Sequence, residues 1–149
     1  MFERCKQFIG RWLPASDRFS LVDTALGPAG ERAAARYLQQ LGYRILARGH
    51  RQRLGEIDLI ALDGNWLVFV EVKTWRCDAA GDPSEAVDRS KQEKLTRAAL
   101  IYLKQRGLLD QPARFDVVSI VWPDKVKQPP AIRHFKNAFE AVGRGQMYR

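Results

Sequence analysis

The sequence predicts a single α/β domain with a central mixed β-sheet of four to five strands that is flanked by helices. Two neighbouring runs, at residues 56–62 and 66–75, are apolar at nearly every position, as in strands that are covered on both faces. Helical patterns stand on either side of these runs, at residues 28–41 and 91–106. Helices on two sides of a sheet would provide both covers, so the element order favours this fold class.

The first helix and the first strand have recognisable boundaries. Pro28 suits the first turn of a helix and Gly42 suits the position after its end, which predicts a helix over residues 28–41. Residues 43–47 are predicted to form the first strand. Residues 48–55 are polar and basic, and a loop is expected there.

A hairpin, a long helix and further strands make up the rest of the predicted domain. The Asp63-Gly64 pair separates the two apolar runs and is a strong signal for a two-residue hairpin turn. Ser90 and Glu93 have the spacing of a capping box at the start of the long helix. The later elements are expected to be a strand at 114–122, a short edge strand at 131–135 and one or two helical turns at 137–142.

The amino-terminal segment, residues 1–26, is predicted to stand apart from the α/β domain at residues 27–142, and residues 143–149 form a basic tail. Apolar side chains recur at helical spacing over residues 2–13, with basic side chains on other faces, until Pro14. A short helix that packs on the domain or on a partner subunit is expected. Contact with a membrane surface or with nucleic acid stays open for this segment.

The composition fits one folded domain with a polyanionic partner. The chain has 149 residues, of which 46% are hydrophobic, so a sizeable core can form. The net charge of +8 favours nucleic acid as a partner, with an acidic membrane surface second. No apolar run approaches the roughly 18 residues of a transmembrane segment. Cys5 and Cys77 form no metal-binding pattern, and a reducing cytoplasm fits best.

Three charged residues interrupt the apolar strands of the predicted hairpin. Asp58 lies on the first strand, and Glu71 and Lys73 lie on the second. Removing such charges from water costs several kcal/mol or more unless they gain a partner or a metal. Because side chains alternate along a strand, Glu71 and Lys73 share one face, and the Val72 carbonyl lies at the edge of the same site. Glu56 shares parity with Asp58 but stands at the start of its strand, where exposure is expected.

The register of the hairpin decides how Asp58 meets the other charges. With a turn at Asp63-Gly64, Asp58 would oppose Phe69 and lie diagonal to Glu71, roughly 7–8 Å away at the backbone. A four-residue loop would place Asp58 directly opposite Glu71. A three-residue loop without a bulge would send the two carboxylates to opposite faces.

These residue types suit a divalent metal and a phosphate. Mg²⁺ prefers a few carboxylate or carbonyl oxygens, and it can activate water and neutralise phosphate charge. Lys73 beside it could orient the attacking water and stabilise developing negative charge. Glu31 borders the apolar stripe of the first helix, where it could act as a first-turn charge or as a second carboxylate beside the metal. The set therefore indicates phosphodiester hydrolysis, and a buried ion pair among the strand charges is the structural alternative.

Five segments of the chain carry a resemblance to a known family over roughly residues 27–140. They resemble the YraN family of proposed endonucleases, which is similar to archaeal Holliday junction resolvases and to the PD-(D/E)-x-K superfamily. The segments are Gly30-Glu31-x-x-Ala34, Gly55-Glu56-Ile57-Asp58-Leu59-Ile60, Phe69-Val70-Glu71-Val72-Lys73-Thr74, Lys91-x-x-x-Leu95 and Arg114-Phe115-Asp116-Val117-Val118.

The resemblance implies a restriction-endonuclease-like fold and a role for each charged residue. It implies that Asp58, Glu71 and the Val72 carbonyl bind Mg²⁺ or Mn²⁺. It further implies that Lys73 is the catalytic lysine and Glu31 an auxiliary acid that also lies beside the metal. Resolvase-like relatives suggest a homodimer by analogy. Ile57 stands where the superfamily has proline, and His50 stands where asparagine is expected.

Basic residues near the hairpin are expected to bind nucleic acid, with DNA favoured over RNA. Arg48, Arg51 and Arg53 could bind phosphates beside the metal site, or could simply be a solvated basic loop. Lys91 on the long helix is a further candidate. No base-reading motif is present, which favours recognition of branched or junction DNA by its structure. The alternative function is a non-catalytic nucleic-acid-binding module on a nuclease scaffold, and a third is a peripheral membrane protein held by residues 2–13.

Overall fold

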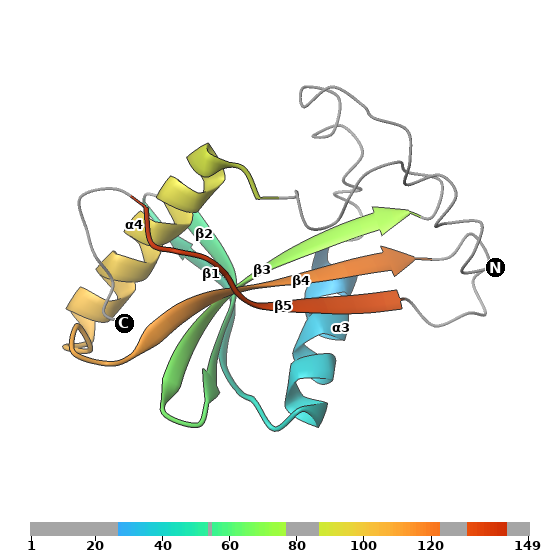
Figure 1. The fold of residues 1–149 in the computed structure, drawn as a ribbon, viewed down its shortest axis with the longest axis horizontal. Coiled ribbons are helices and arrows are strands. Elements are labelled where there is room, and N and C mark those ends of the chain that lie inside the picture. The colour runs from blue at the N-terminus through green and yellow to red at the C-terminus, as the bar shows by residue number, and fades with distance from the viewer. Residues whose placement is uncertain (1–26, 54, 77–86, 123–130, 143–149) are drawn as a thin grey trace.

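The computed structural model describes residues 27–53, 55–76, 87–122 and 131–142. The expectations for residues 1–26 and for the tail at 143–149 lie outside these residues. Figure 1 shows the order of the described elements along the chain. These are α3 (Gly27–Gln40), β1 (Arg44–Gln52), β2 (Gly55–Asp63), β3 (Trp66–Arg76), α4 (Arg89–Gln105), β4 (Ala113–Trp122) and β5 (Ala131–Phe139).

The strands form one five-stranded sheet in the order β1-β2-β3-β4-β5. β3 and β4 pair in parallel, and the connection between them contains α4. The other neighbours, β1–β2, β2–β3 and β4–β5, pair antiparallel. The predicted single α/β domain with a mixed sheet is therefore confirmed, and its open sheet is consistent with a nuclease-like fold.

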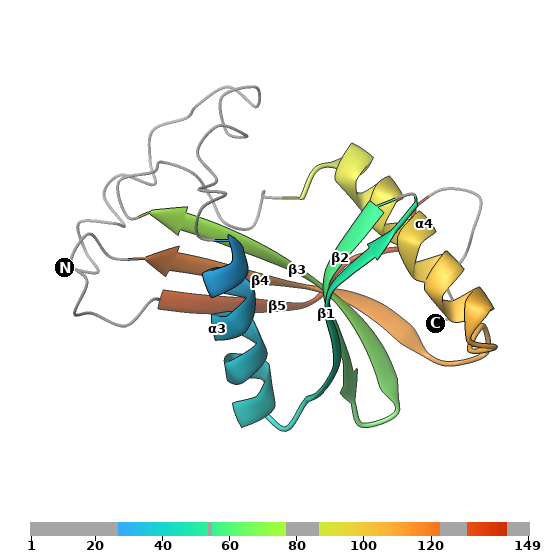
Figure 2. The same ribbon diagram turned by 180° about the vertical axis from the view of Figure 1, so that it is seen from behind.

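Each face of the sheet carries its own hydrophobic core, because one helix covers each face (Figures 1 and 2). Ala34 and Leu38 of α3 pack in a cluster with β2, β3 and β4 side chains such as Val68. Leu95 and Leu103 of α4 pack in a second cluster with β2, β3 and β4 side chains on the other face. Two covered faces explain why the central strands are apolar at nearly every position.

The hairpin turn differs from the prediction. Asp63 pairs with Trp66, so the turn consists of Gly64 and Asn65, and the predicted turn at Asp63-Gly64 is wrong. Gly64 has φ 58°, a left-handed conformation that favours glycine. The Asp63 carboxylate accepts a 2.7 Å hydrogen bond from Arg114 Nη2, a tertiary contact that is available when Asp63 closes the strand.

The shifted turn also changes the register of the two strands. Ile60 pairs with Phe69 and Leu59 with Val70, so the predicted opposition of Asp58 and Phe69 is wrong. Continued by one step, the observed register would bring Asp58 opposite Glu71. The prediction expected this arrangement for a four-residue loop, whereas the structure reaches it with a two-residue turn that is shifted along the chain.

The first strand is longer than predicted. β1 continues to Gln52 and pairs with β2 as far as Gly55, so the loop expected over residues 48–55 is wrong. Gly49 has φ 58°, and the register shifts between Ile45 and Ala47. β1 is an edge strand, and its backbone pairs with β2 while its arginines face water. A strand of this kind lacks the apolar pattern on which sequence prediction depends.

Two further boundaries differ from the prediction. The amino-terminal cap of α4 is Asp88, not Ser90, and its carboxylate accepts a 2.8 Å hydrogen bond from Lys91 N. β5 runs to Phe139, whose ring stacks on Phe115 at 4.7 Å, and residues 140–142 are not helical. The predicted helical turns at 137–142 are therefore wrong, because cross-strand aromatic packing extends the strand.

Candidate metal and phosphodiester site

Strands β2 and β3 separate beyond the Leu59–Val70 pair. From there β2 continues to Gly55 beside β1, whereas β3 continues to Arg76 beside β4. Figure 2 shows β1 and β2 turning away from the other three strands. Asp58 lies directly after the last pair, and its Oδ2 accepts a 2.8 Å hydrogen bond from Val72 N. The carboxylate thus replaces the missing backbone acceptor and is fixed where the strands separate.

Asp58 and Glu71 lie together at this position. Burial and, after it, the neighbouring Glu71 carboxylate together raise the pKa of Asp58 to about 8, although the hydrogen bond from Val72 opposes the shift. Glu71 is 3% exposed. A second buried carboxylate beside Asp58 disfavours the ionised form of Asp58, and a bound cation relieves this conflict.

The two oxygens of Glu71 have different surroundings. Oε1 lies 3.4 Å from Lys73 Nζ and 3.6 Å from Lys91 Nζ. Oε2 is buried and has no hydrogen-bond partner among the residues that the structure describes. An unsatisfied carboxylate oxygen beside a second carboxylate is a donor set that fits Mg²⁺ or Mn²⁺. Lys91, expected to bind nucleic acid, is thus placed beside the acidic group.

Glu31 lies near Asp58 and Glu71 because α3 packs closely on β3. Gly30 lies against Thr74, and a Cβ at Gly30 would collide with the Thr74 Oγ1 atom. Glu31 is the fifth residue of α3, so the role of a first-turn charge does not apply. Burial raises the pKa of Glu31, Glu56 and Glu71 raise it further, and Arg48 and Arg51 lower it.

Replacing Gly30 tests this close packing. Gly30→Ala is expected to destabilise the protein by about 1–3 kcal/mol, because the added methyl group overpacks the α3–β3 contact. Urea denaturation would measure the loss. The double variant Gly30→Ala/Thr74→Ala should recover part of it, since the colliding oxygen is then absent. Equal losses in the single and the double variant would contradict the packing argument.

Glu56 is the site residue that the sequence prediction set aside. It is exposed as expected, with 42% of its side chain accessible, yet its carboxylate joins those of Glu31 and Asp58. One oxygen from each of the three lies within 4.8 Å of the others. Glu56 lies two residues before Asp58 on the same strand, and this spacing was the signal in the sequence that could have identified Glu56 as a site residue.

The predicted phosphate-binding arginines lie on or next to the edge strand, and two of them, Arg48 and Arg51, act electrostatically on Glu31. Arg48 and Arg51 belong to β1, Arg53 follows it, and all three are exposed. Arg51 Nε lies 3.8 Å from Glu56 Oε2. The arrangement forms an exposed basic rim next to the carboxylates.

The pKa of Asp58 predicts how the stability of the metal-free protein depends on pH. Between about pH 4 and about pH 8 the native carboxyl holds a proton that the unfolded chain has released. The free energy of unfolding should therefore fall as pH rises through this window, by at most about 1.4 kcal/mol per pH unit. Urea denaturation in the presence of a chelator would measure the slope. Asp58→Asn should flatten it, and an unchanged slope in that variant would refute the assignment.

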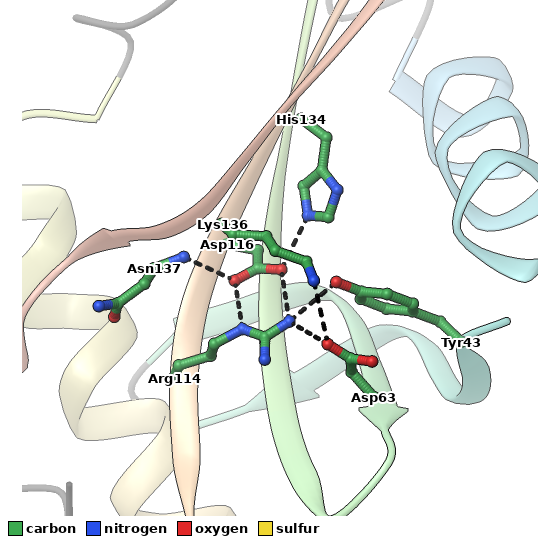
Figure 3. A network of polar contacts seen from close by, with 7 residues as sticks. All are labelled: Tyr43, Asp63, Arg114, Asp116, His134, Lys136 and Asn137. Atoms are coloured by element: carbon green, nitrogen blue, oxygen red, sulfur yellow. Dashed lines mark hydrogen bonds and ion pairs between the residues drawn. The ribbon is translucent and has the colours of Figure 1, made fainter. Parts of the chain in front are cut away.

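A second polar network explains the Arg114-Phe115-Asp116 motif (Figure 3). Asp116 is fully buried and accepts hydrogen bonds from Arg114 Nε at 2.9 Å, His134 Nε2 at 2.8 Å and Asn137 N at 3.0 Å. Burial opposes its ionisation, but these donors outweigh that effect and lower its pKa. Arg114 also donates to Tyr43 and Asp63, so the network joins β4 to β5, to the hairpin and to the residue before β1.

The helices in the described part of the chain are too short or too polar to cross a bilayer. Comparison with known proteins identifies relatives over most of the domain. A match to "Uncharacterised protein family UPF0102" covers residues 30–120.

Three similar proteins illustrate the extent of the match. A UPF0102 protein of Rhodopirellula baltica is 44% identical over 135 residues, which is 88% of this chain and 81% of the relative. One from Geobacter sulfurreducens is 50% identical over 77% of this chain and 88% of its own length. One from Symbiobacterium thermophilum is 56% identical over 64% of this chain and 80% of its own length. These matches confirm the resemblance carried by the five motifs, and the chain belongs to the UPF0102 family, the YraN family.

Proposed function

We propose that this protein is a divalent-metal-dependent endonuclease that hydrolyses phosphodiester bonds in DNA. The observation that carries the proposal is the contact between Asp58 and Glu71 where β2 and β3 separate, with Glu71 Oε2 unsatisfied among the described residues. A buried carboxylate with perturbed ionisation, beside a second buried carboxylate and a lysine, is typical of a catalytic site and costly for a purely structural one.

Asp58, Glu71 and the Val72 carbonyl would hold Mg²⁺ or Mn²⁺, with Glu31 adjacent. When bound, such a cation supplies a Lewis acid that promotes ionisation of water and neutralises phosphate charge. The Val72 N–H holds the Asp58 carboxylate in place through its 2.8 Å hydrogen bond. Lys73 and Lys91 hold Glu71 through Oε1, which leaves Oε2 available as a ligand. Lys73 is also the cationic group that would stabilise negative charge developing on the phosphate.

The basic rim of Arg48, Arg51 and Arg53 would bind the phosphates on either side of the cleaved bond. Phosphate contacts fix the position of a strand without reading its sequence. With no base-reading motif in the chain, DNA structure is the better recognition signal, and branched or junction DNA is the proposed substrate. The protein would act in the cytoplasm, and a homodimer would suit a junction of two duplexes.

The rim makes a measurable prediction about DNA affinity. The double variant Arg48→Ala/Arg53→Ala should bind DNA more weakly. The magnitude of its slope of log affinity against log salt should fall by up to about 2, because the variant neutralises fewer phosphates and so releases fewer counterions on binding. Fluorescence anisotropy at several salt concentrations would measure the slope. Arg133→Ala, an exposed arginine on β5 at the other edge of the sheet, is the control. Equal slopes for the double variant and the control would count against the rim.

A non-catalytic nucleic-acid-binding module is the second candidate. Its support is that two lysines already lie near Glu71 Oε1 and partly neutralise the acidic group. Calorimetric titration with Mn²⁺ separates the candidates, since a module of this kind needs no metal.

The experiment that tests the proposed function is a cleavage assay on labelled branched, nicked, single-stranded and duplex DNA, with matched RNAs. Each substrate is incubated with Mg²⁺, with Mn²⁺ and with a chelator. We expect metal-dependent cleavage that is strongest on branched DNA. A protein that binds these substrates but cuts none of them with either metal would support the module instead.

A further inference from the structure

The outer face of α4 carries positive charge that the proposed function does not use. The helix contains five lysines and arginines but a single acidic residue, Glu93, which lies 3.8 Å from Arg89. Lys94, Arg97 and Lys104 are exposed, and their side chains form no ion pair with any residue that the structure describes. Exposed cations without acidic partners are available to an anionic ligand.

The three cations lie along one stripe of the helix, which we call the α4 ridge. At 3.6 residues per turn, the directions of Lys94, Arg97 and Lys104 fall within an arc of about 80°. The opposite side of the helix, with Leu95 and Leu103, packs on the sheet. The ridge covers ten residue steps, which correspond to about 15 Å along the helix axis.

The α4 ridge adjoins both the basic rim and the proposed metal site. Gly55 lies against the helix, since a Cβ at this position would be 3.9 Å from the Lys94 carbonyl oxygen. Arg53 of the rim is two residues before Gly55. One turn before the ridge, Lys91 Nζ lies 3.6 Å from Glu71 Oε1. The ridge therefore begins close to the proposed position of cleavage and extends away from it.

We propose that the α4 ridge binds the phosphates of a duplex DNA arm that leads away from the cleaved bond. The proposal rests on the proposed function, because it takes DNA as the substrate, and it adds that a duplex flanks that bond. Each strand of a duplex carries a phosphate about every 3.4 Å along the axis, so a ridge of about 15 Å spans about four phosphates of one strand. Such contacts position the arm without reading its sequence.

The residue types on α4 favour a duplex over a single strand or a membrane surface. Single strands are bound by stacking of bases on aromatic side chains, but Tyr102, the one aromatic residue of α4, is 5% exposed. A helix that lies in a membrane surface inserts its apolar side, whereas α4 packs that side on the sheet. In the described part of the chain, the exposed large hydrophobic side chains all lie outside α4.

Duplex binding by a variant with fewer ridge charges tests the proposal. Lys94→Gln/Arg97→Gln removes two charges and introduces residues that favour helix. Fluorescence anisotropy in a chelator, which prevents metal-dependent cleavage, would measure the affinity for short duplexes at several salt concentrations. The magnitude of the slope of log affinity against log salt should fall by about 2, equally for unrelated sequences. The affinity for single strands of the same length should stay unchanged.

Two control variants separate the ridge from general charge effects. Arg36→Gln/Arg133→Gln removes two exposed charges from α3 and β5, and it should keep the wild-type slope. Lys94→Arg/Arg97→Lys exchanges the two cations without changing the charge, and it should also keep that slope. Circular dichroism and melting would show that each variant is folded. The proposal is overturned if the α3 and β5 control loses as much affinity as the ridge variant, or if single strands lose as much as duplexes.

The remaining outcomes distinguish this proposal from the proposed function. A wild-type protein that cleaves branched DNA with metal, and a ridge variant that binds duplexes as wild type does, would uphold the nuclease and overturn the ridge. A wild-type protein that cuts no DNA, and a ridge variant with weakened duplex binding, would uphold the ridge and overturn the nuclease activity. If the ridge variant instead loses binding to vesicles of phosphatidylserine and phosphatidylcholine but not to duplexes, the ridge serves a membrane surface and the proposal is overturned.

Discussion

Asp58→Asn is expected to abolish metal-dependent DNA cleavage while the protein stays folded. The amide keeps an oxygen that can accept the Val72 hydrogen bond, so the local structure where β2 and β3 separate should persist. It removes the negative charge that would bind the metal. We expect the cleavage rate to fall by more than about 100-fold, the upper range for losing a residue that merely supports a metal ligand.

The assay compares single-turnover cleavage of branched DNA by wild type and variant over a range of Mn²⁺ concentrations. Asp110→Asn, the same substitution at an exposed position, is the matched control and should leave the rate unchanged. Lys73→Met would complete the series, since it should lower the rate and spare Mn²⁺ binding. An Asp58→Asn protein that cleaves at the wild-type rate would remove Asp58 from the catalytic site.

Asp116→Ala is expected to destabilise the protein strongly. The Asp116 side chain is fully buried, and its partners Arg114 and His134 have side chains that are 11% and 6% exposed. Removing the carboxylate leaves a buried guanidinium with one partner fewer and an imidazole without its acceptor. Breaking a buried pair in this way typically costs about 3–5 kcal/mol.

Urea denaturation would measure this loss, and hydrogen exchange would show where it acts. Amide protection in β5 should fall first, because Asn137 N and His134 both bond to Asp116. Asp63→Asn is the matched control, since Asp63 also contacts Arg114 but is 31% exposed, and water can replace it at a cost of about 1 kcal/mol or less. Equal losses in the two variants would contradict a special role for the buried carboxylate.

The sequence revealed most of the acidic group because charges in apolar strands are conspicuous. Asp58, Glu71 and Lys73 stand out against the runs that contain them, and the structure brings Asp58 and Glu71 into contact. Glu56 was not recognised, because an exposed glutamate at a strand end looks ordinary until α3 brings Glu31 beside it. The position of Glu56 in the site depends on tertiary packing, which the pattern of side chains along a strand does not predict.

The errors in the fold have the same origin. The Asp63-Gly64 pair is a good local turn signal, but Arg114, fifty-one residues away, binds the Asp63 carboxylate, and the turn forms one residue later. Asp88 and Ser90 are both suitable caps, and local sequence alone does not choose between them. Only the first part of β1 was predicted, because the rest of this edge strand carries polar and basic side chains that meet water and shows no apolar pattern.

The charged edge strand also bears on self-association. A sheet edge offers unpaired backbone groups to any passing strand, and charged side chains along it discourage that addition. Arg44, Arg48 and Arg51 are exposed along β1, while Leu46 beside them is 37% exposed. Arginines that we propose to bind a polyanion would therefore also oppose self-association of the protein when no ligand is present. Variants that neutralise them should aggregate more readily, which light scattering would detect before any loss of folding.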